Sequence, residues 1–203
     1  MTDLQAIILA GGRAARLDGI PKPLVRIEGA TLLERAVSAA RSAGAAPVIV
    51  AGPEVRPAPD DVRWVREDPV FTGPAAALHA AMAVATDAPW TLVLAVDLVR
   101  PAEAVARLMA DRELLPADTD GVCLGDASSR PQWLTGLYRT AALARGTASL
   151  GDEGRDQSVR QIMAELAIAV VRAPDEVVAD IDTWQDLQDA GAVAPGIEKE
   201  EDR

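Results

Sequence analysis

The chain has 203 residues and a formal net charge of -11, with 49% hydrophobic but only 3% aromatic residues. Its length suits one domain, and its charge argues against nonspecific nucleic-acid binding, which needs a basic surface. No stretch approaches the ~20 uncharged apolar residues of a membrane span. The first residues also lack the basic segment of a secretory leader. We therefore expect a cytoplasmic protein without nucleic-acid or membrane partners.

Strand-like and helix-like segments alternate along the chain. Short apolar runs predict strands at 4–10, 24–27, 47–51, 62–66, 91–96, 122–124, 133–138 and 168–171. Helical spacing of apolar residues predicts helices at 31–43, 73–86, 102–110, 157–166 and 183–190. This alternation predicts a three-layer, Rossmann-like α/β fold with a mostly parallel sheet and helices on both faces. Residues 1–191 would form one domain, and the charged, aperiodic residues 192–203 a disordered tail.

A glycine-rich loop follows the first predicted strand. Gly11 and Gly12 leave room for backbone N–H groups to approach phosphate oxygens. Three cations, Arg13, Arg16 and Lys22, lie within ten residues of one another. The loop lacks the G-K-[ST] of a Walker A motif and the G-x-G-x-x-G of a dinucleotide fold. It therefore predicts a cradle for a triphosphate.

Two residue types that are rare in this chain, lysine and cysteine, are informative. The chain has 18 Arg but only two Lys, and Lys22 is the one that follows the glycine loop. Because an ammonium and a guanidinium bind phosphate differently, Lys22 is a candidate phosphate ligand. The single cysteine, Cys123, excludes an internal disulfide and is expected to be packed and inert.

The loop and its surroundings resemble the MobA-like nucleotidyltransferases. The segment from Leu9 to Lys22 matches L-A-G-G-x-x-x-R-[LM]-x-G-x-x-K. Later matches follow in order as far as residue 190: Glu67-Asp68 before Gly73-Pro74, the strand ending at Asp97, Gly136-Leu137-Tyr138-Arg139, Ser158-Val159-Arg160, and the segment 180–187. The departures include Pro21, Val96, and Arg130-Pro131-Gln132, and they bear on the acceptor more than on the fold.

The resemblance implies transfer of GMP from GTP to molybdopterin, with release of pyrophosphate and dependence on Mg²⁺. An acceptor phosphate is already nucleophilic, so alignment and charge neutralisation would suffice for catalysis. The implied metal ligands are Asp97 and either Asp182 or Asp180, and the implied acceptor-binding residues are Trp133 and Tyr138. Leu9, Ala10, Gly11, Gly12, Lys22, Asp68, Gly73 and Asp97 would bind the nucleotide, and Lys22, Arg13, Arg16 and Asp97 would be catalytic.

Other interpretations of these residues and of the whole chain remain open. Asp97 can instead cap a helix near Pro101, Asp182 can cap the last helix, and Asp68 can form a turn before Pro69. Arg13 and Arg16 can be solvated loop charges, and Trp133 can be a core residue. The alternative functions are a cytidylyltransferase or sugar-phosphate nucleotidyltransferase of the same fold, or a non-catalytic nucleotide-binding homologue.

Overall fold

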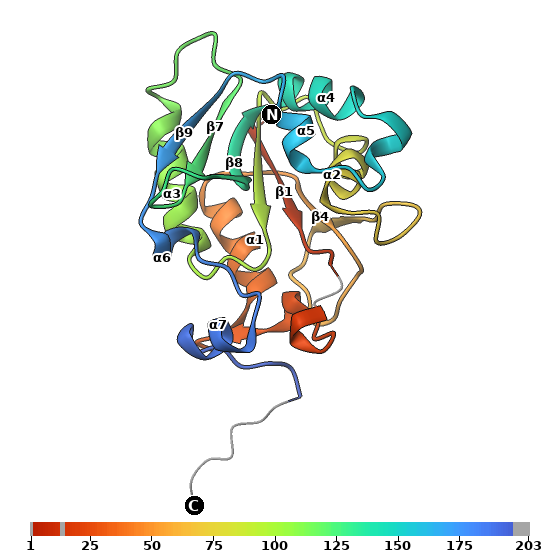
Figure 1. The fold of residues 1–203 in the computed structure, drawn as a ribbon, viewed down its shortest axis with the longest axis vertical. Helices are drawn as coiled ribbons and strands as arrows, with labels where there is room; N and C mark the ends of the chain where they lie inside the picture. The colour runs from red at the N-terminus through yellow and green to blue at the C-terminus, as the bar shows by residue number, and fades with distance from the viewer. Residues whose placement is uncertain (1, 13–14, 197–203) are drawn as a thin grey trace, which may run out of the picture.

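The structure is a computed structural model that describes residues 2–12 and 15–196. Its centre is a sheet of seven strands in the order β5-β4-β1-β6-β8-β7-β9 (Figure 1). The antiparallel strand β8 is inserted between β6 and β7, and the other pairs are parallel. The strands are β1 (Leu4–Leu9), β4 (Val48–Ala51), β5 (Val62–Val65), β6 (Trp90–Ala95), β7 (Gly121–Gly125), β8 (Pro131–Arg139) and β9 (Ile168–Arg172).

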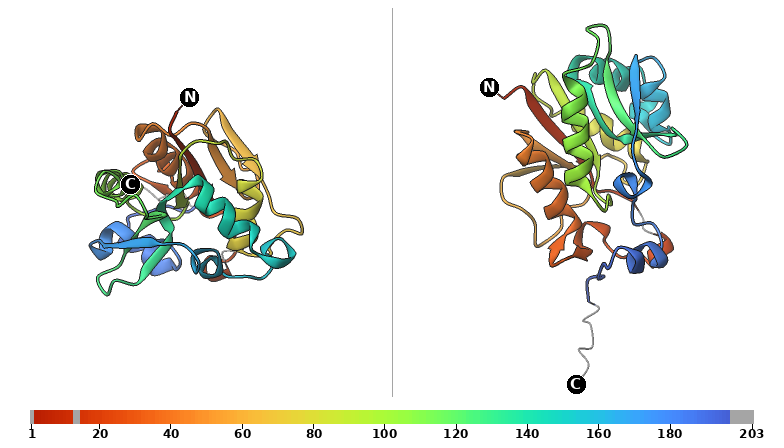
Figure 2. Two further views of the ribbon diagram at one scale, coloured as in Figure 1. Left: turned by 90° about the horizontal axis from the view of Figure 1, so that it is seen from above. Right: turned by 90° about the vertical axis from the view of Figure 1, so that its left-hand side faces the viewer.

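Helices cover both faces of this sheet (Figures 1 and 2). Helices α1 (Leu32–Ser42), α3 (Pro101–Arg112) and α6 (Asp175–Val178) pack on one face. Helices α2 (Pro74–Met82), α4 (Thr140–Ala148) and α5 (Val159–Met163) pack on the other. The expected three-layer α/β fold is therefore confirmed.

The central strand β1 shows why the sheet is covered twice. Every residue of β1 is buried, and successive side chains point to opposite faces. Leu4, Ala6 and Ile8 contribute to the core under α1 and α3. Ile7 and Leu9 contribute to the core under α2 and α5. A strand that is apolar on both faces must be covered on both.

A third, smaller apolar cluster lies below the carboxyl ends of the strands. It joins α7 (Trp184–Asp189) to the hairpin of β2 (Arg26–Ile27) and β3 (Ala30–Thr31). Val193 pairs with Arg26 through two backbone hydrogen bonds of 2.8 and 2.9 Å, and Ala194 is buried. The predicted boundary of the disordered tail was therefore wrong for residues 192–196, and residues 197–203 lie outside the described part of the chain.

Two helices of the structure were not expected. Helix α4 follows β8 directly, without a glycine or proline to separate them, and α6 is a helix of four residues that begins after Pro174. Gly146 in α4 allows close packing on α5, because a Cβ there would lie 2.6 Å from the Ile162 carbonyl oxygen.

Among the described residues, no helix is long and apolar enough to cross a bilayer.

Candidate active site

The glycine loop leaves the carboxyl end of β1 at the middle of the sheet. Gly12 has φ +130, a conformation that glycine adopts readily. Gly52, at the end of β4, presses against the loop: a Cβ there would lie 2.8 Å from the Ala10 carbonyl carbon and 2.9 Å from the Gly11 nitrogen. Sequence reasoning missed this supporting role, although a glycine directly after a buried strand was visible.

Three carboxylates gather at the carboxyl end of β6. Asp97 follows β6, and the backbone of residues 97–99 pairs with residues 179–181 through a Leu98–Asp180 bridge and an Ile181 N–H···O Asp97 bond of 3.1 Å. Because Ile181 is buried in the small cluster, its neighbours Asp180 and Asp182 face the other way. One oxygen from each of Asp97, Asp180 and Asp182 lies within 4.8 Å of the others.

The capping roles considered for these aspartates are taken by other residues. The N-cap of α3 is Arg100, so Asp97 does not cap that helix. The N-cap of α7 is Thr183, whose side chain accepts a hydrogen bond from the Asp186 N–H in a capping box. Asp97 and Asp182 therefore remain available to bind a ligand.

Lys22 lies between two of the carboxylates. Its ammonium nitrogen is 2.8 Å from Asp97 Oδ2 and 2.5 Å from Asp182 Oδ1, and its side chain is only 16% exposed. Burial lowers the pKa of Lys22, but Asp97 and Asp182 outweigh that effect and raise it above its ordinary 10.5. Lys22 is therefore a charged group in contact with both carboxylates.

The cluster as a whole still favours a cation. Burial, with the negative charges of Asp97 and Asp182, raises the pKa of Asp180 above its ordinary 3.8. Arg16 is a second cation beside Lys22, but its contact is longer: its Nη1 lies 3.9 Å from Asp182 Oδ2, and its side chain is 75% exposed. An all-carboxylate donor set of this size matches the oxygen ligands that hard divalent cations prefer.

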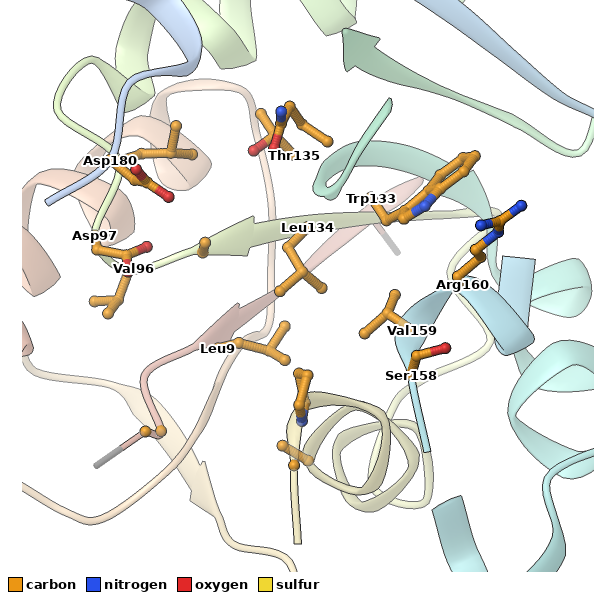
Figure 3. A pocket seen from close by; sticks show the side chains of 18 of the residues that line it. Leu9, Val96, Asp97, Trp133, Leu134, Thr135, Ser158, Val159, Arg160 and Asp180 are labelled. Carbon is orange, nitrogen blue, oxygen red and sulfur yellow. The ribbon is translucent and has the colours of Figure 1, made fainter. Parts of the chain in front are cut away.

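Two compartments meet at the glycine loop. The smaller, about 700 Å³, is lined by the loop, Lys22, Arg16, Arg66 and Asp182. The larger, about 1170 Å³, runs from Asp97 and Asp180 to Trp133 and Arg160 over an apolar floor that includes Leu9, Leu134 and Val159 (Figure 3). The residues that line both compartments are Gly11, Gly12 and Phe71.

Most of the predicted site residues surround these compartments. Leu9, Gly73, Asp97 and Trp133 line the larger one, and Ala10 and Lys22 the smaller. Gly73 has φ +104 and forms the N-cap of α2, which explains a glycine there. Arg13 lies outside the described residues.

Tyr138 lines neither compartment, so its predicted place in a binding cleft was wrong. Its side chain is fully buried in the core between the sheet and α2, and its hydroxyl donates a 2.7 Å hydrogen bond to the Trp133 carbonyl oxygen. Tyr138 therefore supports the backbone at Trp133 from within. The physical reason is its place along β8: Tyr138 pairs with Thr91 near the start of β6, whereas the compartment lies beyond the carboxyl end of that strand.

Asp68 was predicted to bind the nucleotide, but its neighbour Glu67 faces the cleft instead. Asp68 is exposed and lines neither compartment. Glu67 is only 9% exposed, lines the larger compartment, and its Oε1 accepts a 2.9 Å bond from the Phe71 N–H. Glu67 Oε2 has no hydrogen-bond partner among the described residues. An acid followed by a proline was visible in the sequence, but not which of two adjacent acids points inward.

Cys123 is packed, as expected, and His79 is a second side chain that lies between packed elements. Cys123 is buried, and burial raises the pKa of its thiol to about 12. His79 Nδ1 lies 3.2 Å from the Thr147 carbonyl oxygen, between α2 and α4. Neither lines the compartments described above.

The chain is similar to a family model and to two named relatives. A family model described as the MobA-like NTP transferase domain matches residues 6–171. A probable molybdenum cofactor guanylyltransferase of Opitutus terrae is 32% identical over 191 residues, 92% of each chain. A molybdenum cofactor guanylyltransferase of Burkholderia lata is 32% identical over 194 residues, 91% of this chain and 93% of the relative.

A solved structure has the same fold. A nucleotidyl transferase from Methanothermobacter thermautotroptrophicus is similar with a TM-score of 0.66 and 25% identity, covering 92% of this chain and 94% of that one. The family match covers well over half of this chain, and the two relatives are similar to nearly all of it. The chain therefore belongs to the MobA-like NTP transferase family of nucleotidyltransferases.

Proposed function

We propose that this nucleotidyltransferase transfers GMP from GTP to the phosphate of a molybdopterin acceptor, with a divalent metal ion, most simply Mg²⁺. The observation that carries the proposal is the contact of Lys22 with the carboxylates of Asp97 and Asp182 beside a glycine loop. The choice of GTP and molybdopterin is supported by the names of the two relatives at 32% identity.

The metal would be held by Asp97 and Asp182, with Asp180 as a third ligand. The three carboxylates carry like charge and lie within 4.8 Å of one another, an arrangement that a bound divalent cation would stabilise. When bound, such an ion polarises phosphate oxygens and neutralises the charge that develops during transfer. Lys22, already touching two of the ligands, is well situated to bind phosphate oxygens at the same place.

The rest of the nucleotide would extend from the cluster along the edge of the sheet. The strands β6, β1, β4 and β5 are consecutive neighbours, and three strand spacings amount to roughly 14 Å. Phosphates would contact the backbone at Gly11 and Gly12, and Arg16 from the exposed side. The base would then lie toward β4 and β5, near Glu67 and Phe71.

The chemistry requires no general base from the protein. An oxygen of the acceptor phosphate attacks the α-phosphorus, forming a new P–O bond. The bond from the α-phosphorus to the α,β-bridging oxygen breaks, and pyrophosphate leaves with that electron pair. Lys22 and Arg16 would neutralise the leaving group, and the backbone donors of the glycine loop would fix its geometry.

The acceptor would occupy the part of the larger compartment between Asp97 and Trp133. Trp133 offers a flat apolar surface for a pterin ring, and Arg160 is a cation at the same end of the cleft (Figure 3). Asp97 lies at the other end, where the α-phosphate would be. A long acceptor with a ring at one end and a phosphate at the other fits this separation of apolar and charged groups.

Nucleotide-dependent thermal stabilisation tests the proposal. GTP, CTP, ATP and UTP would each be compared with and without Mg²⁺, because a ligand at 100 times its Kd stabilises by about 2.7 kcal/mol. We expect selective, Mg²⁺-dependent stabilisation by GTP that is lost in Asp97→Asn. Asp189→Asn, which removes an exposed acid of α7 away from the cleft, serves as the matched control.

Two results would contradict parts of the proposal. Selective stabilisation by CTP would assign the chain to cytidylyl transfer. No stabilisation by any nucleotide at saturating concentration would refute the triphosphate role of the loop. Pyrophosphate release that requires GTP together with molybdopterin would identify the acceptor.

A further inference from the structure

Arg35 reaches from helix α1 to the loop that carries Asp97. Its Nη2 donates a 3.0 Å hydrogen bond to the carbonyl oxygen of Val99. Its Nη1 lies 3.8 Å from Glu28 Oε2, and the side chain is only 24% exposed. A guanidinium with a fixed plane is well suited to hold one carbonyl in one direction.

Val99 lies where the segment that carries Asp97 pairs with the segment that carries Asp180 and Asp182. Its N–H donates a 3.0 Å bond to the Ala179 carbonyl, one residue before Asp180. Its carbonyl accepts from Arg35, so one peptide on each side of Val99 is fixed. The neighbouring contacts are the Leu98–Asp180 bridge and the 3.1 Å bond from the Ile181 N–H to the Asp97 carbonyl.

The pairing of residues 97–99 with residues 179–181 holds like-charged carboxylates close together. One carboxylate oxygen from each of Asp97, Asp180 and Asp182 lies within 4.8 Å of the others. Like charges at this distance favour separation of the segments that carry them. Lys22, which contacts both Asp97 and Asp182, and the backbone hydrogen bonds between residues 97–99 and 179–181 oppose that separation. Arg35 adds a side-chain anchor on the 97–99 segment itself.

We propose that Arg35 is a positioning residue for the metal site: by holding the Val99 carbonyl, it fixes Asp97 against Asp180 and Asp182. The inference rests on the metal site of the proposed function, although Arg35 lines neither compartment of the cleft. Removing Arg35 leaves the Val99 carbonyl without its side-chain donor and loosens the 97–99 segment. Mutation of a residue that orients metal ligands typically lowers the metal affinity by about 10–100-fold.

The test compares Arg35→Met with Arg35→Lys and Arg41→Met. Arg41 is the matched control, because it also lies on α1 and also donates a guanidinium N–H to a backbone carbonyl, that of Asp60, away from the cluster. The first readout is amide hydrogen exchange at Val99 and Ile181, which needs no metal. The second is the Kd for Mn²⁺, measured by electron paramagnetic resonance on the full chain.

In Arg35→Met we expect exchange at Val99 and Ile181 to accelerate, and the Mn²⁺ Kd to rise by about tenfold or more. Arg41→Met should change neither quantity. Arg35→Lys, which retains one donor, should recover part of the Mn²⁺ affinity. A merely structural role would instead accelerate exchange throughout α1 and leave the Mn²⁺ Kd of the folded protein unchanged.

Two outcomes would overturn the proposal, and they are distinguishable. If the wild type binds Mn²⁺ and Arg35→Met binds it within twofold of the wild type, Arg35 does not position the ligands. If the wild type itself does not bind Mn²⁺, the proposed metal site fails, and the role of Arg35 fails with it.

Discussion

Glu67 lines the larger compartment with a carboxylate of which only one oxygen is engaged. Oε1 accepts from the Phe71 N–H at 2.9 Å, whereas Oε2 has no partner among the described residues. A buried polar atom without a partner is uncommon and costs about 1–3 kcal/mol. At the residue scale, a ligand that brings N–H donors to this place would recover that cost, and the Watson–Crick edge of guanine carries such donors.

Glu67→Gln is therefore expected to weaken GTP binding by about tenfold, or about 1.4 kcal/mol. The amide can keep its oxygen on the Phe71 N–H only by turning its NH₂ group toward the ligand. Isothermal titration calorimetry gives the Kd directly. Asp68→Asn is the control, because it removes the adjacent exposed charge. A larger loss in Asp68→Asn than in Glu67→Gln would refute this role of Glu67.

Helix α1 is fixed at its N-terminus by a capping box. Thr31 accepts from the Glu34 N–H at 3.1 Å, and Glu34 Oε2 accepts from the Thr31 N–H at 2.7 Å. The hydrogen bond from the Thr31 backbone lowers the pKa of Glu34 below its ordinary 4.5. At the element scale this cap stabilises α1, the helix from which Arg35 reaches the Asp97 loop.

The capping box predicts a pH dependence of stability. Because the pKa of Glu34 is lower in the folded state, its contribution is present above the unfolded pKa and is lost as the pH falls through the folded one. Thr31→Ala should cost about 1 kcal/mol at pH 7, measured by urea denaturation. The stability difference between the wild type and Glu34→Gln should shrink below about pH 4.5. A difference that grows on acidification would contradict this assignment.

At the scale of the whole molecule, the folded core shields Cys123, the only cysteine of the chain, from solvent. The thiol is buried in β7 at the middle of one core cluster, and burial raises its pKa to about 12. Reaction with iodoacetamide at pH 8 requires a thiolate, so it requires exposure of the core. Labelling of Cys123 is therefore a measure of opening of the whole domain.

We expect alkylation in the native protein to be at least about a thousandfold slower than after denaturation in guanidinium chloride. A nucleotide that binds the folded state should slow it further. Mass spectrometry gives the extent of labelling without interference from other thiols. Rapid alkylation of the native chain would show that the β7 region opens locally.

Local patterns in the sequence determined most of the elements and part of the site. The strands were recognisable because continuous apolar runs are buried on both faces of a parallel sheet. The glycine loop and Lys22 were recognisable because they are contiguous and follow the first strand, and Asp97 because it ends a buried strand. These signals need no knowledge of distant contacts.

Other features depend on contacts between distant segments. Asp180 and Asp182 join Asp97 only because residues 97–99 pair with residues 179–181. The pairing of β8 with β6 and the packing of residues 192–196 are likewise set by partners far along the chain. Capping one helix and binding one cation use the same residue types, so composition could not choose between them.

The faces of individual side chains were the least predictable property. Glu67 rather than Asp68 points into the cleft, and Tyr138 points into the core rather than toward an acceptor. A shift of one residue reverses the face of every side chain on a strand, and an irregularity such as that at Cys123 and Leu124 changes the register without changing the pattern. The sequence by itself thus determined the fold class and the position of the glycine loop with Lys22. Only the tertiary structure decided which neighbouring side chains meet, because that depends on register and long-range pairing.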